Sequence, residues 1–266
     1  EALGRLSRED PTFHTTLHEE TGQTNISGMG ELHLEVLKHR LVSDFKVQAN
    51  VGKPRVSYRQ TVRGPGEAEH TFERLIQGKD QVATVRIRVE PAESGSGTLF
   101  AVEDPSESVL PKFRPAVEEG VLFAAQGGLD LGFPVIDVKA TVLGGRTHET
   151  DSTETAFGAA GGEAFREACE AAGVAILEPI MRFEVTTPAE FVGPIQSDLA
   201  RRNAVVEGED LRGELRVIRG TVSLNQMFGY STSVRSLSQG RASYSMEPAG
   251  FREVPPDVAK RLSFGD

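Results

Sequence analysis

Tryptophan is absent from this 266-residue sequence, tyrosine occurs three times, and Cys169 is the one cysteine. Few flat rings are therefore available on which single-stranded nucleic acid could stack. A single cysteine excludes an internal disulfide framework and cysteine-rich zinc sites, and we expect a reducing compartment, the cytoplasm, with Cys169 as a core residue. No apolar run approaches the roughly 18 residues that span a bilayer, so we expect no transmembrane helix and no membrane partner.

Motifs for nucleotide and metal binding are also missing. No segment fits the glycine-rich phosphate loop of nucleotide hydrolases. Gly28 and Gly30 follow a predicted strand, but His33 stands where a dinucleotide fingerprint has its third glycine, so a tight turn is the simpler interpretation. His14 and His18 would lie about 13 Å apart along a strand, too far to share an ion. We expect no cofactor and no metal in this chain.

The charge balance is acidic, with 29 Lys and Arg against 39 Asp and Glu, a net charge of −10. Nearly all of the excess lies in residues 63–177, which carry 10 basic and 19 acidic side chains. Such a segment is repelled by bulk phosphate, so any contact with RNA must be made by a few local side chains. Hydrophobic residues at 38% and charged residues at 26% are ordinary for a globular chain, and the length predicts two or three domains.

Two changes of pattern predict the domain boundaries. A turn-rich stretch lies at 63–66, and a helical pattern gives way to a strand pattern near 175–179. We expect domains at 1–62, 63–177 and 178–266. The first eight residues read as the end of a helix, so we expect the chain to be a piece of a longer protein.

The apolar periodicity predicts the elements of each segment. The first segment has predicted strands at 12–18, 23–27 and 46–51 and a helix at 30–44, in addition to the initial helix. The second has predicted strands at 82–90 and 134–143, the latter with Ile136, Val138, Ala140 and Val142 inward, and helices at 112–126 and 154–172. The third has predicted strands near 180–187, 204–207, 214–222 and 241–247 and helices near 191–202 and 225–237.

This element order predicts an α+β fold. Two ferredoxin-like split βαβ units, of which the first lacks a strand before residue 1, flank a distinct elongated α/β arm domain. The helix at 154–172 carries small residues, with Phe157, Ala160, Ala164 and Ala168 on one face. Side chains of this size let a helix pack closely on a sheet.

The segment 144–154 lies between a predicted strand and a predicted helix and has three interpretations. His148 with Glu149 or Asp151 could form a general acid–base pair in a small enzyme. Asp151 or Ser152 could instead cap the following helix, with Glu154 completing the cap. The third interpretation, which we favour, is a loop tip that inserts into a partner, because no nucleophile or second catalytic cluster accompanies His148 in the sequence.

Arginines at the end of the helix at 191–202 also have two interpretations. Arg201 and Arg202 complement the negative end of a helix, or they contact phosphate. Arg235 and Arg241, around the turn at 236–240, could likewise contact phosphate.

Several motifs resemble elongation factor G, in order and over essentially the whole chain. Residues 24–35 (TNISGMGELHLE) and 49–54 (ANVGKP) resemble its third domain. The loop 145–157 resembles the tip of its fourth domain. Residues 177–181, 198–202 and 227–244 resemble its fifth domain.

This resemblance implies a function. It implies that a GTPase domain and a second domain lie upstream, and that the GTPase domain binds GTP and Mg²⁺. This chain itself would then carry out no covalent chemistry. The full-length protein is expected to act as a monomer on the ribosome, contacting ribosomal RNA, ribosomal proteins and the tRNA–mRNA in the decoding region during translocation. The arm tip would comprise Gly78, Lys79, Arg146, Thr147 and His148. The residues facing large-subunit RNA would be Arg235, Ser236, Gln239 and Arg241.

One departure from the family pattern affects this expectation. Members usually carry a His-x-Lys-Gln stretch and a paired-glycine loop where this chain has residues 72–80 (FERLIQGKD). Only Gly78 and Lys79 preserve the glycine and the cation. Paralogues for ribosome recycling or ribosome protection vary at the same place, and they are the alternative to a translocase.

Overall fold

The computed structural model describes residues 2–17, 24–29, 31–49, 51, 56–76 and 78–264. Their contacts divide the chain into two compact units. The first unit combines the residues up to Val56 with Pro179–Gly250, and the second combines Ser57–Glu178 with the segment from Phe251 onward. In the part of the chain that is described, no helix is long and apolar enough to cross a membrane.

The N-terminal part of the first unit contains α1 (Ala2–Glu9), β1 (His14–Leu17), β2 (Thr24–Ser27) and α2 (Glu31–His39). β1 and β2, which were both predicted as strands, form an antiparallel pair. The core consists of Leu6, Phe13, Leu37 and Leu41.

The end of this part differs from the prediction. The predicted helix 30–44 changes at Arg40 into a π-helical turn (Arg40–Asp44), in which the amide of Phe45 donates to the Arg40 carbonyl. The predicted strand 46–51 is wrong for its described residues 46–49 and 51, which are irregular. Lys46 adopts a left-handed backbone (φ 55°) and the amide of Val47 donates to the Leu41 carbonyl, so the chain turns back on the helix instead of extending.

The C-terminal part of the first unit has the predicted ferredoxin-like order β-α-β-β-α-β. Its elements are β8 (Val174–Pro188), α5 (Val192–Arg201), β9 (Val205–Arg212), β10 (Leu215–Ser223), α6 (Tyr230–Leu237) and β11 (Ser243–Glu253), with short 3₁₀ turns before α5 and α6. The sheet order is β11-β8-β10-β9, with β10 antiparallel to both of its neighbours. Phe183, Ile195, Leu199, Ile218 and Tyr230 fill the core. The predicted α+β fold class is confirmed.

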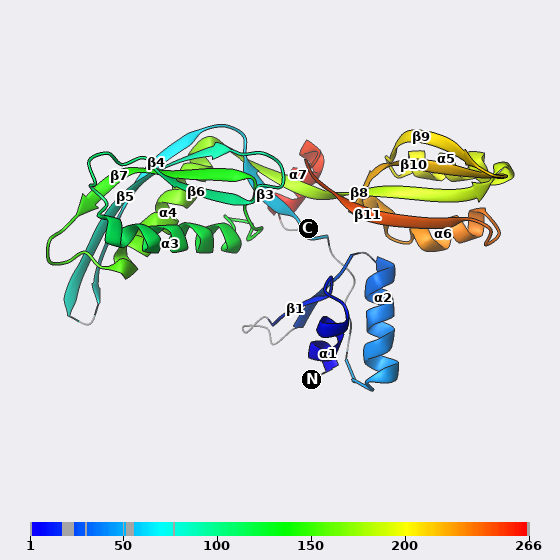
Figure 1. Ribbon diagram of the computed structural model, residues 1–266, viewed down its shortest axis with the longest axis horizontal. Helices are drawn as coiled ribbons and strands as arrows, with labels where there is room; N and C mark the ends of the chain where they lie inside the picture. The colour runs from blue at the N-terminus through cyan, green and yellow to red at the C-terminus, as the bar shows by residue number, and fades with distance from the viewer. Residues whose placement is uncertain are drawn as a thin grey trace. The chain divides into compact units, whose positions relative to one another are not determined.

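The second unit is built on a four-stranded sheet of order β4-β5-β7-β6. Its strands are β4 (Gly66–Ile76), β5 (Lys79–Pro91), β6 (Thr98–Val102) and β7 (Val138–Thr147). β6 and β7 are parallel and are connected through α3 (Arg114–Gly127), whereas the other pairs are antiparallel. α4 (Glu154–Ala172) follows β7 and begins and ends where the sequence predicted (Figure 1).

The core of this unit lies between the sheet and the two helices. Phe157, Ala160, Ala164 and Ala168 of α4 are fully buried, as predicted, as are alternate residues of β5. β7 begins at Val138, four residues later than predicted. Ile136 is consequently not part of the buried face, because Asp137 turns the chain with a left-handed backbone (φ 58°) before the strand begins.

Glycines set the distance between α3 and α4. A Cβ atom added at Gly120 of α3 would lie 2.0 Å from the carbonyl oxygen of Gly158 of α4. One added at Gly161 would lie 2.8 Å from a methyl group of Val117. The small residues of α4 therefore permit close packing against another helix, in addition to the predicted packing on the sheet.

Four elements were not predicted: the strands β4 and β6 of the second unit's sheet, and also β3 and α7. β3 (Arg59–Val62) pairs antiparallel with the first residues of β8. α7 (Pro256–Phe264) follows β11. The segment from Phe251 is held within the second unit by an ion pair of Arg63 with Glu253 and by a 2.9 Å hydrogen bond from the amide of Val254 to the Ile176 carbonyl.

Candidate functional sites

The β4–β5 hairpin extends past the rest of its sheet. The last pair between β5 and β7 is Ala83 with Thr147, whereas β5 continues to Lys79, which pairs with Ile76. At about 3.3 Å per residue, Lys79 lies about 13 Å beyond Ala83. Gly78 adopts a left-handed backbone (φ 77°), which glycine takes at little cost in a tight turn. Gly78 and Lys79 are exposed at this hairpin end.

The loop after β7, residues 148–153, is tied to the overhanging part of β5; we call it the tip loop. The amide of Val82 donates to the Asp151 carbonyl over 2.9 Å. The Ser152 hydroxyl donates to the Val82 carbonyl over 2.7 Å and accepts from the amide of His148 over 2.8 Å. The tip loop is thereby held against the sheet.

Thr153 caps α4, by accepting a 3.1 Å hydrogen bond from the amide of Ala156. The predicted cap at Asp151 or Ser152 is therefore wrong by one or two residues, because both are engaged with β5 or with the loop itself. Glu154 is the first residue of the helix rather than the closing residue of a capping box.

His148 is part of the tip loop and is 57% exposed. Its Nδ1 lies 3.0 Å from a carboxylate oxygen of Asp151. The hydroxyls around this pair are already used within the fold, since Thr150 donates to Asp151 and Ser152 donates to β5. The geometry offers a hydrogen-bonding imidazole on a supported loop; the Thr150 hydroxyl, 3.4 Å from Nδ1 of His148, already donates to Asp151.

A cleft of about 720 Å³ brings three of the five predicted tip residues together: Arg146, Thr147 and His148. Gly78 and Lys79 do not line it. Glu73 and Glu107 face the same cleft, so its charge is mixed. Arg146 is exposed, whereas the Thr147 hydroxyl donates over 2.8 Å to the Ser108 carbonyl and is engaged within the fold.

Sequence reasoning missed the segment that lies beneath this cleft. Asp104 is 6% exposed and its carboxylate accepts from the hydroxyls of Ser106 and Ser108 and from the amide of Val109. Burial acts to raise the pKa of Asp104, but these hydrogen bonds outweigh it and the pKa lies below its usual value. The Asp-x-Ser-x-Ser spacing at 104–108 is a signal for such a turn that could have been noticed.

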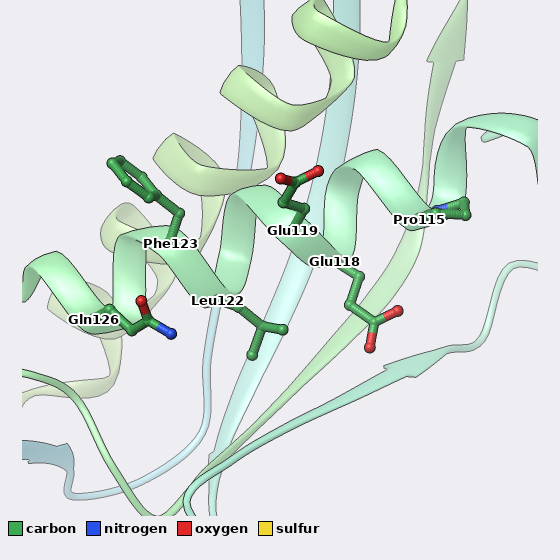
Figure 2. Close-up of a pocket in the computed structure, with 6 residues that line it drawn as sticks. All are labelled: Pro115, Glu118, Glu119, Leu122, Phe123 and Gln126. Carbon is green, nitrogen blue, oxygen red and sulfur yellow. The ribbon is translucent and has the colours of Figure 1, made fainter. Parts of the chain in front are cut away.

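A second hollow, of about 420 Å³, lies along the outer face of α3. Figure 2 shows Phe123 and Glu119 pointing to one side of the helix and Glu118 and Leu122 to the other. Phe123 is 73% exposed. Because its charged lining side chains are both carboxylates, this hollow is unsuited to phosphate.

The predicted RNA-facing turn follows α6 in the first unit. Arg235, Ser236 and Gln239 line this turn at the surface of the unit. The turn is held from below by the buried Ser238, whose hydroxyl donates to the Val234 carbonyl over 2.7 Å and accepts from the amide of Ala242 over 3.0 Å.

Arg241 is exposed as well but has partners within the fold. Its guanidinium is paired with Glu190 and lies 4.6 Å from the centre of the Phe191 ring. Any contact of Arg241 with phosphate would therefore exchange one anionic partner for another.

Arg202 is a structural residue. Its guanidinium donates to Asp198, to the carbonyls of Gln226 and Phe228 and to the hydroxyl of Ser233, and it stacks over the Tyr230 ring. These partners use four of its five N–H donors, so Arg202 is poorly suited to contact phosphate. Arg201, 73% exposed, is bonded to the same Asp198 carboxylate.

No cluster of three or more His, Cys, Asp or Glu side chains is placed to hold a metal ion within the described part of the chain. Cys169 is fully buried in the core of the second unit, as predicted. In the described part of the chain, the cleft beside the tip loop therefore contains neither a metal-binding cluster nor the thiol of Cys169.

Comparison with known proteins gives a consistent match. Family models match the chain consecutively: elongation factor G domain III at residues 1–53, elongation factor G domain IV at 54–173, and the elongation factor G C-terminus at 175–262. A crystal structure of a protein from Thermus thermophilus is similar, with a TM-score of 0.81 and 36% sequence identity. The match covers 98% of this chain and 39% of that protein, so this chain spans well under half of its length. The chain belongs to the elongation factor G family.

Proposed function

We propose that this chain is the ribosome-engaging C-terminal part of a translation factor that moves tRNA and mRNA. GTP with Mg²⁺ would be bound and hydrolysed by a domain outside this chain, and the resulting movement would carry the arm tip into the decoding region. In this proposal the chain makes contacts and transmits movement but catalyses no reaction, and the full-length factor acts as a monomer in the cytoplasm.

The observation that carries the proposal is the construction of the tip. The tip loop is hydrogen-bonded to the overhanging hairpin at Val82, so the two segments support each other. This arrangement presents Arg146, His148 and Lys79 at one end of a segment whose net charge is −9. A body of that charge avoids non-specific binding to RNA, and a few cationic or hydrogen-bonding tip residues can then recognise RNA by position and shape.

The turn after α6 would provide a second contact. Arg235, Ser236 and Gln239 lie at the surface on a turn that Ser238 holds rigid, which suits contact with folded RNA. We propose that this surface, with Arg241, faces the large ribosomal subunit. The fragment alone would bind weakly, since only part of a multivalent contact surface is present.

The test uses the full-length factor with ribosomes. Arg146→Ala and His148→Ala should each slow tRNA–mRNA movement by about tenfold or more while GTP hydrolysis continues, because an interaction worth about 1.4 kcal/mol or more is lost. Arg166→Ala is the matched control, because Arg166 is paired with Glu163 on α4 and does not line the cleft. Unchanged movement in both tip variants would contradict the proposal.

The hairpin end supports one alternative within the family. Leu75 is 70% exposed and Arg74 stacks over the Phe72 ring, where family members usually carry a basic, paired-glycine loop. This hairpin end is less basic than the usual loop, and paralogues that separate ribosomal subunits or displace a ligand vary at the same place. Assaying the full-length factor for tRNA–mRNA movement and for splitting of post-termination ribosomes decides between these functions.

An acid–base enzyme using His148 is the more distant alternative. It predicts that the isolated chain converts a small substrate without ribosomes and that His148→Ala abolishes this conversion. Substrate turnover by the isolated chain would therefore replace the proposal for this loop.

A further inference from the structure

The end of β7 that carries the tip residues extends beyond the part of the strand that pairs with β6. The parallel pairing of β6 with β7 ends at Val102 with Val142. Beyond this point the register with β5 shifts, since Ile87 pairs with Val142 but Arg86 pairs with Gly144. This irregularity is a β-bulge, which bends a strand and changes the direction of the residues that follow.

Side-chain packing contributes little to the direction of this strand end. A Cβ atom at Gly145 would lie 2.0 Å from the Thr84 carbonyl oxygen, so no larger residue fits there. One at Gly144 would lie 2.9 Å from the Ser108 hydroxyl. With two glycines at this point, hydrogen bonds direct the strand end: those of the ladder with β5, which continues to Thr147, and those on its other side.

The segment 103–109, which we call the support loop, takes the place of β6 beside this strand end. The amide of Gly145 donates to the Ser108 hydroxyl over 2.9 Å. Two residues later, the Thr147 hydroxyl donates to the Ser108 carbonyl over 2.8 Å. Ser108 therefore holds alternate residues of β7, on both sides of Arg146.

Asp104 holds Ser108 in turn. The Ser108 hydroxyl lies 3.0 and 3.1 Å from the two carboxylate oxygens of Asp104, and the amide of Val109 donates to the same carboxylate over 2.8 Å. Asp104 is buried, so these hydrogen bonds are protected from competition by water. A continuous chain of contacts thus runs from Asp104 through Ser108 to the strand end.

We propose that Asp104 and Ser108 are positioning residues for the arm tip, which fix the direction in which Arg146 and His148 are presented to the ribosome. The proposal rests on the proposed function for its consequence, but its structural part is independent of ribosomes. Neither residue lies in the motifs that carry the family resemblance.

The experiment uses the full-length factor and a matched pair of serine variants. Ser108→Ala removes the acceptor of the Gly145 amide, whereas Ser106→Ala removes another hydroxyl bonded to Asp104 that does not contact β7. Ser108→Ala should raise hydrogen exchange at the Gly145 amide by about tenfold or more, because a half-buried donor loses its partner. It should also slow tRNA–mRNA movement severalfold when assayed well below the melting temperature of the variant, and Ser106→Ala should do neither.

A double variant tests the connection between the two residues. Asp104→Asn combined with Ser108→Ala should slow movement no more than the stronger single change, since both act through one chain of contacts. Additive effects would overturn the proposal. Unchanged hydrogen exchange at Gly145 in Ser108→Ala would also overturn the proposal. So would raised exchange in Ser108→Ala with normal tRNA–mRNA movement, if Arg146→Ala does slow that movement. If neither Arg146→Ala nor His148→Ala has an effect, the proposed function fails, and exchange at Gly145 alone decides whether the support loop positions the strand.

Discussion

Asp198 and Arg202, one helical turn apart at the end of α5, are joined by a 2.8 Å hydrogen bond. Their side chains are only 13% and 18% exposed. The same guanidinium donates to the carbonyls of Gln226 and Phe228, the residues that lead into α6. This arginine therefore joins the two helices of the ferredoxin-like part, and α6 carries the exposed turn proposed to face RNA.

Arg202→Met should lower the free energy of unfolding by about 2 kcal/mol, because it leaves two carbonyls without this donor and removes one of the two arginines bonded to the largely buried Asp198 carboxylate. Urea denaturation followed by tyrosine fluorescence measures this directly, since Tyr230 and Tyr244 both lie in this part of the fold. Arg201→Met is the matched control, because Arg201 is 73% exposed and a surface ion pair contributes less than about 1 kcal/mol. Equal effects of the two changes would mean that Arg202 is no more than a surface partner of Asp198.

Gly120→Ala should destabilise the second unit by about 2–3 kcal/mol, because the new methyl group overpacks the interface between two helices. It would meet the Gly158 carbonyl at 2.0 Å, and α3 and α4 would have to separate. Gly127→Ala, near the end of the same helix, is the control: nothing lies within 4 Å of the added Cβ, and alanine should stabilise the helix slightly. Thermal unfolding followed by circular dichroism should show changes of opposite sign.

Asp104 should make the stability of the second unit depend on pH. Because the pKa of Asp104 is lowered in the folded state, the ionised carboxylate stabilises the fold above its unfolded pKa of about 3.8, and this contribution is lost as the pH falls through the lower folded pKa. Asp104→Asn should be less stable than the parent protein at pH 7, and the difference should shrink below about pH 4. Urea denaturation at about pH 7, 5, 4 and 3 measures it; a difference that stays constant with pH would mean that the charge of Asp104 contributes nothing.

Cys169 should be unreactive while the protein is folded. Burial raises the pKa of its thiol to about 12, so that at about pH 8 only about one molecule in ten thousand carries the reactive thiolate. Ellman's reagent should label none of it within an hour under native conditions and all of it in guanidinium chloride. Rapid native labelling would show that the helix α4 opens locally.

Local periodicity determined much of this fold in advance. The helix at 154–172 was predicted to the residue, because small and apolar side chains recur there at helical spacing and Gly173 ends it. The alternation in β5 predicted which face is buried. The motifs at 24–35, 145–157 and 227–244 were specific enough by themselves to indicate the family.

Tertiary contacts decided the rest. Helical spacing continues to residue 44, but backbone hydrogen bonds of Phe45 and Val47 turn the chain before the predicted strand can form. β3 becomes a strand because it pairs with β8, far along the chain. The support of the tip by Ser108 joins residues 37 and 39 positions apart, across a parallel crossover. Spacing along the sequence reports only what neighbouring residues do, whereas these contacts depend on which distant backbone groups the folded sheet brings within hydrogen-bonding distance.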